Sequence, residues 1–216
     1  MIGVLASCAG TSTTQLSPAD RAALKGRIVA VARHDKTEPF MVMKSDIRFA
    51  GALLGAGEMF SQARNAGERM VSDYRISDPT GLVTSRLSSA LARSTGAKPV
   101  TPAHAVTAKG EGTPAEIAAT YPSSDYILDL RTTGWGMGTQ KMNFRRYYVG
   151  HGSKLRLIET KTGRVVAEGF HSFEAGDEKE PGYEDLTGNG ARFLKEELKN
   201  AGNDAEEYFK TEVLGI

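Results

Sequence analysis

Two segments in which apolar and polar residues alternate, joined by a short turn, limit the fold of this chain more than any other feature. In residues 144–160, FRRYYVGHGSKLRLIET, Leu155 and Leu157 alternate with basic residues, which is typical of a strand with one buried face. The turn KTG, ending at Gly163, leads into a second strand-like segment at 164–173, RVVAEGFHSF. A short glycine-containing turn between two such segments predicts an antiparallel β-hairpin.

The segments before this hairpin alternate between strand-like and helix-like patterns. Residues 27–33, RIVAVAR, form a short apolar run that is typical of a strand covered on both faces. Strands are also expected at 97–106 and 125–133, with helices at 78–95 and 113–121 between them. The expected fold class is therefore α/β: a mixed sheet in which βαβαβ is followed by the hairpin, with helices packed on the sheet.

The C-terminal part predicts two more helices. An apolar stripe runs from Phe193 to Ala201, and Asn203-Asp204 is expected to start a last helix that carries Tyr208, Phe209 and Val213. The glycine-rich segment 50–67 has helical spacing, but its glycines interrupt the pattern and it predicts no specific role.

A second glycine-rich stretch, GWGMGTQKMN at 134–143, follows the strand at 125–133. We interpret it as a loop that presents large side chains to a partner, because Trp, Tyr and Arg dominate the energetics of protein interfaces. The candidate patch consists of Trp135, Met137, Arg145, Arg146, Tyr147 and Tyr148. The alternative is that Trp135 packs in the core and its basic neighbours are solvated.

The single cysteine lies eight residues from the start of the sequence, in MIGVLASC. Leu5-Ala6-Ser7-Cys8 resembles a lipobox, the end of a bacterial lipoprotein signal, although only Met1–Val4 precede it and no positively charged segment is present. The polar AGTSTTQLS that follows has the composition of a flexible tether. The expected organisation is a truncated signal at 1–8, a tether at 9–16 and one domain at 17–216; the alternative is an inert cysteine.

The charge balance argues against a nucleic-acid partner. The chain has 27 basic and 26 acidic residues, a net charge of +1. No apolar run approaches the roughly 18 residues that span a bilayer. Contact with a membrane is therefore expected only through a lipid anchor at Cys8. Ala9, directly after the cysteine, resembles the sorting signal of outer-membrane lipoproteins rather than that of inner-membrane lipoproteins.

Taken together, the lipobox, the βαβαβ order, SDYILDLRTTGW and YYVGHGSKLRLIETKTGRVVAEG resemble a group of small bacterial envelope lipoproteins. These share the fold of the TolB amino-terminal domain and include curli-secretion and penicillin-binding-protein-activator lipoproteins. The resemblance covers residues 78–173, with Thr162-Gly163 at the hairpin turn. It implies a non-enzymatic module that binds an envelope protein or a copy of itself; the pore-forming hairpins of the curli-secretion members are not recognisable here.

The sequence contains no established catalytic motif. Its four histidines lack metal-ligand spacing, and no nucleophile elbow, P-loop or zinc box is present, so neither a metal nor a cofactor is predicted. One alternative is a periplasmic hydrolase, in which His151 and His171 face each other across the hairpin with Glu168 or Asp129 beside them. Another alternative is a carrier of a small ligand.

Overall fold

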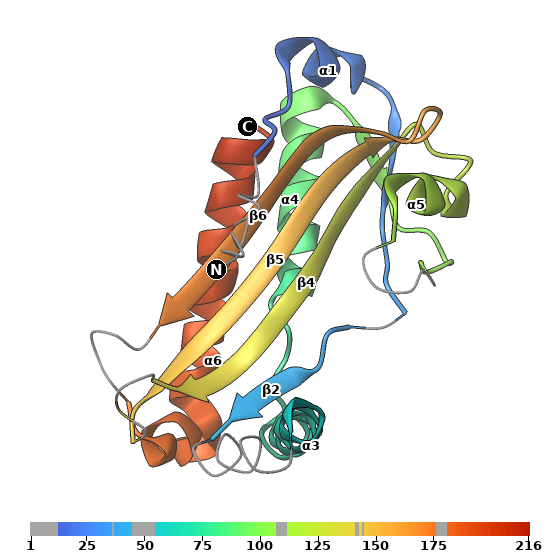
Figure 1. Cartoon of the computed structure of the whole chain (residues 1–216). Coiled ribbons are helices and arrows are strands. Elements are labelled where there is room, and N and C mark those ends of the chain that lie inside the picture. Colours follow the sequence, from blue (N-terminus) through green and yellow to red (C-terminus); the bar gives the residue numbers. More distant parts are fainter. Residues whose placement is uncertain are drawn as a thin grey trace, which may run out of the picture.

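A single mixed sheet of six strands forms the centre of the protein (Figure 1). The computed structural model describes residues 13–35, 37–44, 55–106, 112–140, 143, 145–175 and 181–216. The strand order is β3-β1-β4-β5-β6, and β2 pairs with the far half of β4. The strands are β1 (Ile28–Val31), β2 (Phe40–Met43), β3 (Lys98–Val100), β4 (Tyr126–Thr139), β5 (Tyr147–Glu159) and β6 (Arg164–Ala175).

The pairing directions confirm the predicted mixed α/β fold. β1 is parallel to both β3 and β4, as right-handed crossover connections require, and β2 is parallel to β4. The long strands β4, β5 and β6 are antiparallel neighbours. At the tight turn between β5 and β6, the Gly163 N–H donates to the Glu159 carbonyl and Gly163 adopts a φ of 68°, which explains the glycine.

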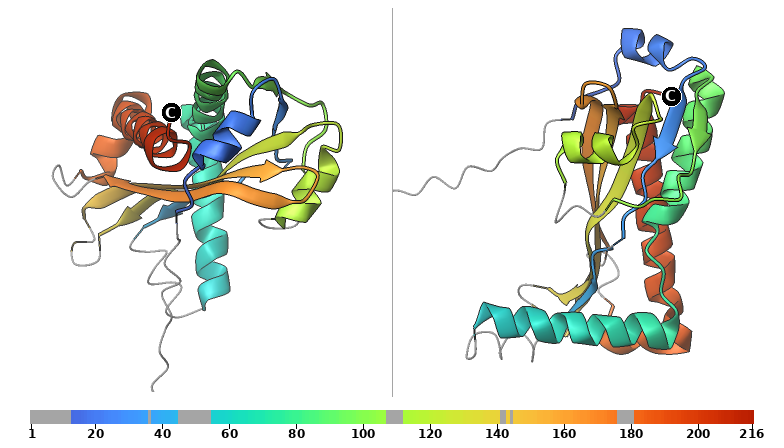
Figure 2. Two further views of the ribbon diagram at one scale, coloured as in Figure 1. Left: turned by 90° about the horizontal axis from the view of Figure 1, so that it is seen from above. Right: turned by 90° about the vertical axis from the view of Figure 1, so that its right-hand side faces the viewer.

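Two long helices cover one face of the sheet, as Figure 2 shows. The helices are α1 (Pro18–Ala23), α3 (Ala56–Tyr74), α4 (Thr80–Thr95), α5 (Pro114–Thr120) and α6 (Tyr183–Tyr208), followed by the π-helix η1 (Phe209–Val213). α4 and α6 lie on the covered face, α5 packs on the opposite face near the hairpin turn, and α3 crosses the other end of the sheet beside β2. None of the helices in the described ranges is long and apolar enough to cross a lipid bilayer.

Several helix ends follow the signals in the sequence. Thr113 and Glu116 form the expected capping box at the start of α5. Gly96 ends α4 in the left-handed conformation, with a φ of 74°. The Asp78 carboxylate accepts a hydrogen bond from the Thr80 N–H, although α4 itself begins only at Thr80.

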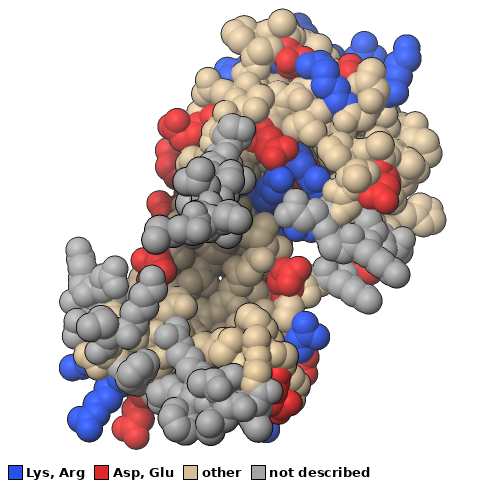
Figure 3. All heavy atoms as spheres, in the orientation of Figure 1, with Lys and Arg blue, Asp and Glu red and all other residues tan. Residues whose placement is uncertain are grey.

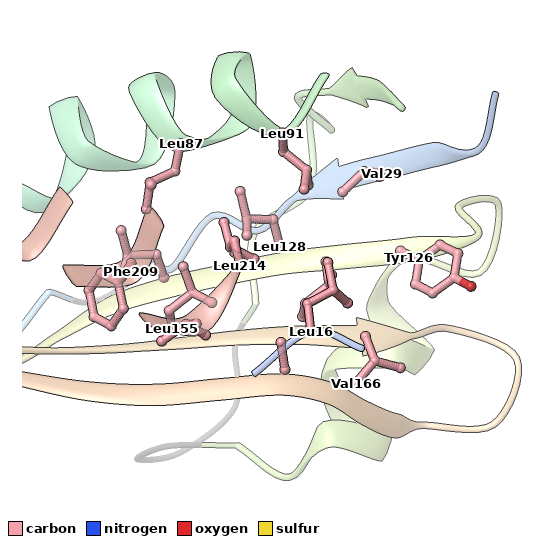
Figure 4. Close-up of a cluster of buried hydrophobic side chains, with 14 of the residues drawn as sticks. Leu16, Val29, Leu87, Leu91, Tyr126, Leu128, Leu155, Val166, Phe209 and Leu214 are labelled. Atoms are coloured by element: carbon pink, nitrogen blue, oxygen red, sulfur yellow. The ribbon is translucent and has the colours of Figure 1, made fainter. Parts of the chain in front are cut away.

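The main core lies between the covered face and α4, α6 and η1 (Figure 4). Leu128 and Leu155 on neighbouring strands meet Leu87, Leu91 and Phe209 from the helices, and each of these five side chains is fully buried. Burying one such side chain contributes about 1.5–3 kcal/mol. This core fixes which face of β4, β5 and β6 remains uncovered.

The glycine-rich stretch after residue 133 is strand, not the predicted loop. β4 continues to Thr139, and its glycines at 134, 136 and 138 lie opposite Gly152, Gly150 and Tyr148 of β5. The intervening Trp135 and Met137 point to the other face, into a second core cluster with Phe40 and Leu194. The glycines and the large side chains therefore alternate between the two faces of a regular strand, and the glycines do not make this stretch a loop.

The C-terminal helices also differ from the prediction. Asn203-Asp204 does not restart a helix, because α6 continues through both residues. The departure from helical geometry lies earlier, where residues from Gly188 to Ala191 have non-helical backbone angles. After α6 the backbone widens into the π-helix η1, which packs against β6 with Phe209 and Val213 buried.

The polypeptide before α1 takes part in the fold. Thr14, which the sequence assigned to the tether, exchanges two backbone hydrogen bonds with Glu168 of β6. Leu16 is buried in the main core, and its N–H donates to the Val213 carbonyl. The described part of the chain therefore starts at the edge of the sheet formed by β6.

Candidate functional site

The face of β4, β5 and β6 that α4 and α6 leave uncovered is the candidate site, and we call it the open face. Figure 3 shows this side of the molecule with a hollow across its middle. The strand registers place on this face the side chains of Asp129, Arg131, Tyr148, Lys154, Arg156, Glu168, Phe170, Ser172 and Glu174. They alternate along each strand with the residues of the cores beneath α4 and α6.

On one half of the open face, glycines replace side chains along β4 and β5. Gly134, Gly136, Gly150 and Gly152 form two directly opposed pairs on β4 and β5. Beside them, the Tyr148 ring lies over Gly138, where an added Cβ would come within 3.0 Å of ring atoms. An aromatic ring over a strand glycine restores packing that the glycine lacks. The result is a stretch of backbone that we call the glycine floor: Tyr148 lies over Gly138, the Met41 backbone of β2 lies against Gly136, and Thr133 and Phe170 lie beside Gly152.

The other half of the open face carries a buried charge network. Arg156 Nε donates to Asp129 Oδ2 over 2.9 Å, and His34 Nε2 lies 2.7 Å from Asp129 Oδ1. Burial opposes ionisation of Asp129, but the hydrogen bond from His34 and the charge of Arg156 outweigh it, so the pKa of the Asp129 carboxyl lies below its usual range. Arg156 also donates to the Gly112 carbonyl.

Further charges lie between this network and the glycine floor. Lys154 Nζ lies 2.9 Å from Glu168 Oε1, in a pair that spans β5 and β6. Arg131 is the direct neighbour of Lys154 on β4. In Figure 3, Lys and Arg side chains gather at the upper end of the hollow, with acidic side chains beside them. Since Arg131, Lys154 and Arg156 outnumber Asp129 and Glu168, this end of the open face has a small positive charge, and the glycine floor has none.

The outer edge of β6 forms the border of the open face. Since Glu168 directs both its N–H and its C=O to Thr14, the alternate residues Phe170, Ser172 and Glu174 direct theirs to the same outer side. Beyond the Thr14 bridge, no strand within the described ranges pairs with this edge. Ser172 and Glu174 are exposed. Edge groups of this kind are a template for another strand.

The structure divides the patch that the sequence proposed. Trp135, Met137 and Tyr147 are buried, with Trp135 only 8% exposed. The Trp135 indole N–H donates to the Glu38 carbonyl over 2.7 Å, and its ring packs edge-on against Phe40. Trp135 is thus in the core, which was the alternative interpretation. Of the other patch members, Arg145 and Arg146 are exposed, and Tyr148 is half-buried on the open face.

The histidine-carboxylate face of the hydrolase alternative does not exist in this arrangement. His151 and His171 lie on the covered face, opposite to Glu168 and Asp129. They are not paired with each other: His151 lies 3.5 Å from Asp78, and His171 lies 3.0 Å from Asp204. Among the described residues, no group of histidines, cysteines and carboxylates could hold a metal ion. Cys8 lies outside the described residues.

Sequence reasoning missed the glycine floor and the β6 edge. The signal for the floor was present, since glycines recur at every second position in both 134–138 and 150–152. Two such runs within a predicted antiparallel pair indicate a face without side chains. The edge had no local signal, because the last strand of a sheet is identified only by what pairs with it.

Comparisons with known proteins give no family. No protein-family model and no curated protein matches the sequence. Similar solved structures include the LpoB C-terminal domain from Salmonella enterica, with 13% identity and a TM-score of 0.30 over 69% of this chain and 83% of that one. Lipoprotein GNA1162 from Neisseria meningitidis has 11% identity and a TM-score of 0.28, over 82% and 99% of the two chains. The hypothetical protein CT253 from Chlamydia trachomatis has 10% identity and a TM-score of 0.31, over 85% and 97%.

Proposed function

We propose that this protein is a non-enzymatic lipoprotein of the bacterial envelope. In this proposal Cys8 carries the lipid, the anchor lies in the outer membrane, and the domain faces the periplasm. The domain binds an extended segment of a partner envelope protein along the edge of β6. The observation that carries the proposal is the row of outward-facing backbone groups at Phe170, Ser172 and Glu174.

The Thr14 bridge supports strand addition at this edge. Thr14 already pairs with Glu168 in antiparallel geometry, so an extended chain fits against β6 at that point. Two residues further along, from Phe170 onwards, the same backbone groups have no strand partner among the residues that the structure describes. In recognition by strand addition, main-chain hydrogen bonds supply affinity, and alternate side chains supply specificity through neighbouring surfaces.

The open face supplies such a surface. A strand added to β6 would place every second side chain beside Phe170, Ser172 and Glu174, at the margin of the glycine floor. The cationic end with Lys154 favours acidic groups at the Glu168 end of the added segment. The partner segment that fits best is therefore extended, with small or flat side chains toward the floor and an acidic end.

The position of Cys8 would hold this edge close to the membrane. Cys8 precedes Thr14 by six residues. Because an extended chain covers at most 3.3–3.6 Å per residue, a lipid on Cys8 would lie within about 20 Å of Thr14 and hence of the middle of β6. A partner bound at this edge would be close to the membrane surface. Stable anchoring requires more than one acyl chain, as a triacylated cysteine provides.

Two measurements on cells test the anchor and the edge separately. The intact mass of the membrane-extracted protein, expressed with upstream codons, should show loss of the residues before Cys8 and gain of acyl chains, and Cys8→Ala should show neither. A photoreactive amino acid at Glu174 should then crosslink to an envelope protein. The same probe at Ser89, on the exposed side of α4, should not.

Variants at Ser172 show whether the crosslink depends on the β6 edge. Ser172→Pro removes an outward N–H that the sheet does not use, and Ser172→Ala keeps it. Loss of the crosslink in the proline variant alone supports strand addition. An equal crosslink in both variants, or only internal crosslinks to residues 8–12, contradicts it. A product with the mass of two chains would identify a second copy as the partner.

A further inference from the structure

A pocket of about 280 Å³ lies between α4 and α6, where the turn after α3 passes between them. It belongs to the helical side of the protein, so the sheet separates it from the open face. This volume is just below the roughly 300–1,000 Å³ that is usual for ligand pockets. The pocket therefore has room for a small molecule and is distinct from the proposed binding edge.

The lining of the pocket is largely apolar. Ile76, Val83 and Leu198 are buried side chains of the second and main cores and form its floor. Leu82 at the rim is 54% exposed, one of the few large apolar side chains that reach the surface in the described ranges. An exposed leucine beside a concave apolar floor provides a place for an apolar group to leave water.

Cationic side chains surround this apolar floor. The side chains of Arg75, Lys195 and Lys199 line the pocket, and none of these side chains has a hydrogen bond or ion pair within the part of the chain that the structure describes. Arg86, a fourth cation of the lining, donates to Glu206 over 2.9 Å and to Asn203. Three cations around one pocket without an acidic partner favour an anionic occupant.

Asp78 is the one acidic residue of the lining, and its carboxylate is engaged on the side of the sheet. It accepts hydrogen bonds from the Thr80 N–H and from the Thr132 hydroxyl, and His151 lies 3.5 Å away. These hydrogen bonds stabilise its single negative charge and hold the carboxylate toward Thr132 and His151, whereas the pocket is lined by four cations. Asp78 therefore does not reverse the cationic character of the rim.

We propose that this pocket binds a small amphiphilic anion, with a carboxylate head and a short apolar body. The body would lie against Ile76, Leu82 and Leu198, and the head would reach Lys195, Lys199 and Arg75 at the rim. Each part of the ligand matches one part of the lining. The inference is independent of partner binding at β6, because the two sites lie on opposite sides of the sheet.

Octanoate, used below its micellar concentration, is the probe. In a titration followed by amide NMR, octanoate should shift the resonances of Ile76, Leu82 and Leu198 and saturate. Acetate lacks the body, octanol lacks the charge and octylammonium reverses it, so each should bind at least tenfold more weakly. Adding salt should weaken octanoate binding, since the head groups are at the surface.

Variants locate the site. Lys195→Glu with Lys199→Glu should weaken octanoate at least tenfold, and Leu82→Ser should also weaken it. All three side chains are exposed, so the core is left intact. Lys161→Glu, the same change at the exposed β5–β6 turn, is the matched control and should bind like the parent protein. Shifts elsewhere, no saturation, equal binding of octanol or octylammonium, or an equal loss in Lys161→Glu would overturn the proposal.

Discussion

Asp129 and Arg156 are direct cross-strand partners on β4 and β5, and the Arg156 Nη2 atom lies 2.7 Å from Asp129 Oδ2. Both side chains are almost completely buried. His34 and the Gly112 carbonyl satisfy further atoms of the pair. A buried ion pair of this kind contributes little to the net stability of a protein. Removing one partner is costly, however, because the other charge then stays buried without a counter-ion.

Asp129→Ala is therefore expected to reduce the free energy of unfolding by about 3–5 kcal/mol, because it leaves Arg156 buried without its counter-ion. Urea unfolding at neutral pH measures the change. The partly exposed pair of Arg86 and Glu206 is the control, and Glu206→Gln should cost at most about 1 kcal/mol. A loss below about 1 kcal/mol in Asp129→Ala would show that the pair is not buried as described.

Gly67 is expected to tolerate no side chain. A Cβ at this position of α3 would collide with the backbone carbonyl of Phe40 in β2, which cannot move as a side-chain end can. Gly67→Ala should thus reduce stability by about 1–3 kcal/mol or more. Gly57→Ala in the same helix meets nothing within 4 Å and should raise stability by up to about 1 kcal/mol. Equal effects of the two substitutions in thermal unfolding would refute close packing of α3 on β2.

Stability should fall as the pH is lowered through the titration of His171. Burial disfavours the imidazolium, and the nearby Asp204 offsets this only in part, so the pKa of His171 lies below its usual 6.5. At a pH between the lower pKa of the folded state and the usual value, His171 therefore binds a proton in the unfolded chain but stays neutral in the folded chain. The stabilisation is present above 6.5 and is lost as the pH falls through and below that value.

Urea unfolding at about pH 7.5 and about pH 5.5 measures this loss, in a range above that in which carboxylates titrate. His171→Gln has no titrating group at this position, so its free energy of unfolding should decrease less between the two pH values. An NMR titration of the imidazole gives its pKa directly. A His171 pKa above 6.5, or an identical decrease in the variant, would contradict the burial of this side chain.

Trp135 is the only tryptophan, so its fluorescence reports on its burial. We expect emission shifted to the blue of exposed indole and weak quenching by acrylamide. Phe40→Ala removes the ring that packs edge-on against Trp135 and should increase quenching and cost about 3–5 kcal/mol. Strong quenching in the parent protein would favour the exposed patch over the core position.

The sequence by itself determined the local elements of this protein. The alternation in 144–173 and the glycine at the turn specify the β5–β6 hairpin, the Thr113–Glu116 capping box starts α5, and Gly96 ends α4. These signals act within a few residues, through hydrogen bonds and backbone angles that the local residues define. The order of the elements then sufficed to predict a mixed α/β sheet.

Only the tertiary structure decided which way the side chains of those elements point. Trp135 lies in the core, and His151 and Glu168 lie on opposite faces, because the pairing register and the irregularity between Thr132 and Gly134 set the facing of each residue. The free edge of β6 and the pocket beside Leu82 likewise depend on which elements meet there. Register, edges and pockets arise from contacts between distant segments, and a local pattern does not contain them.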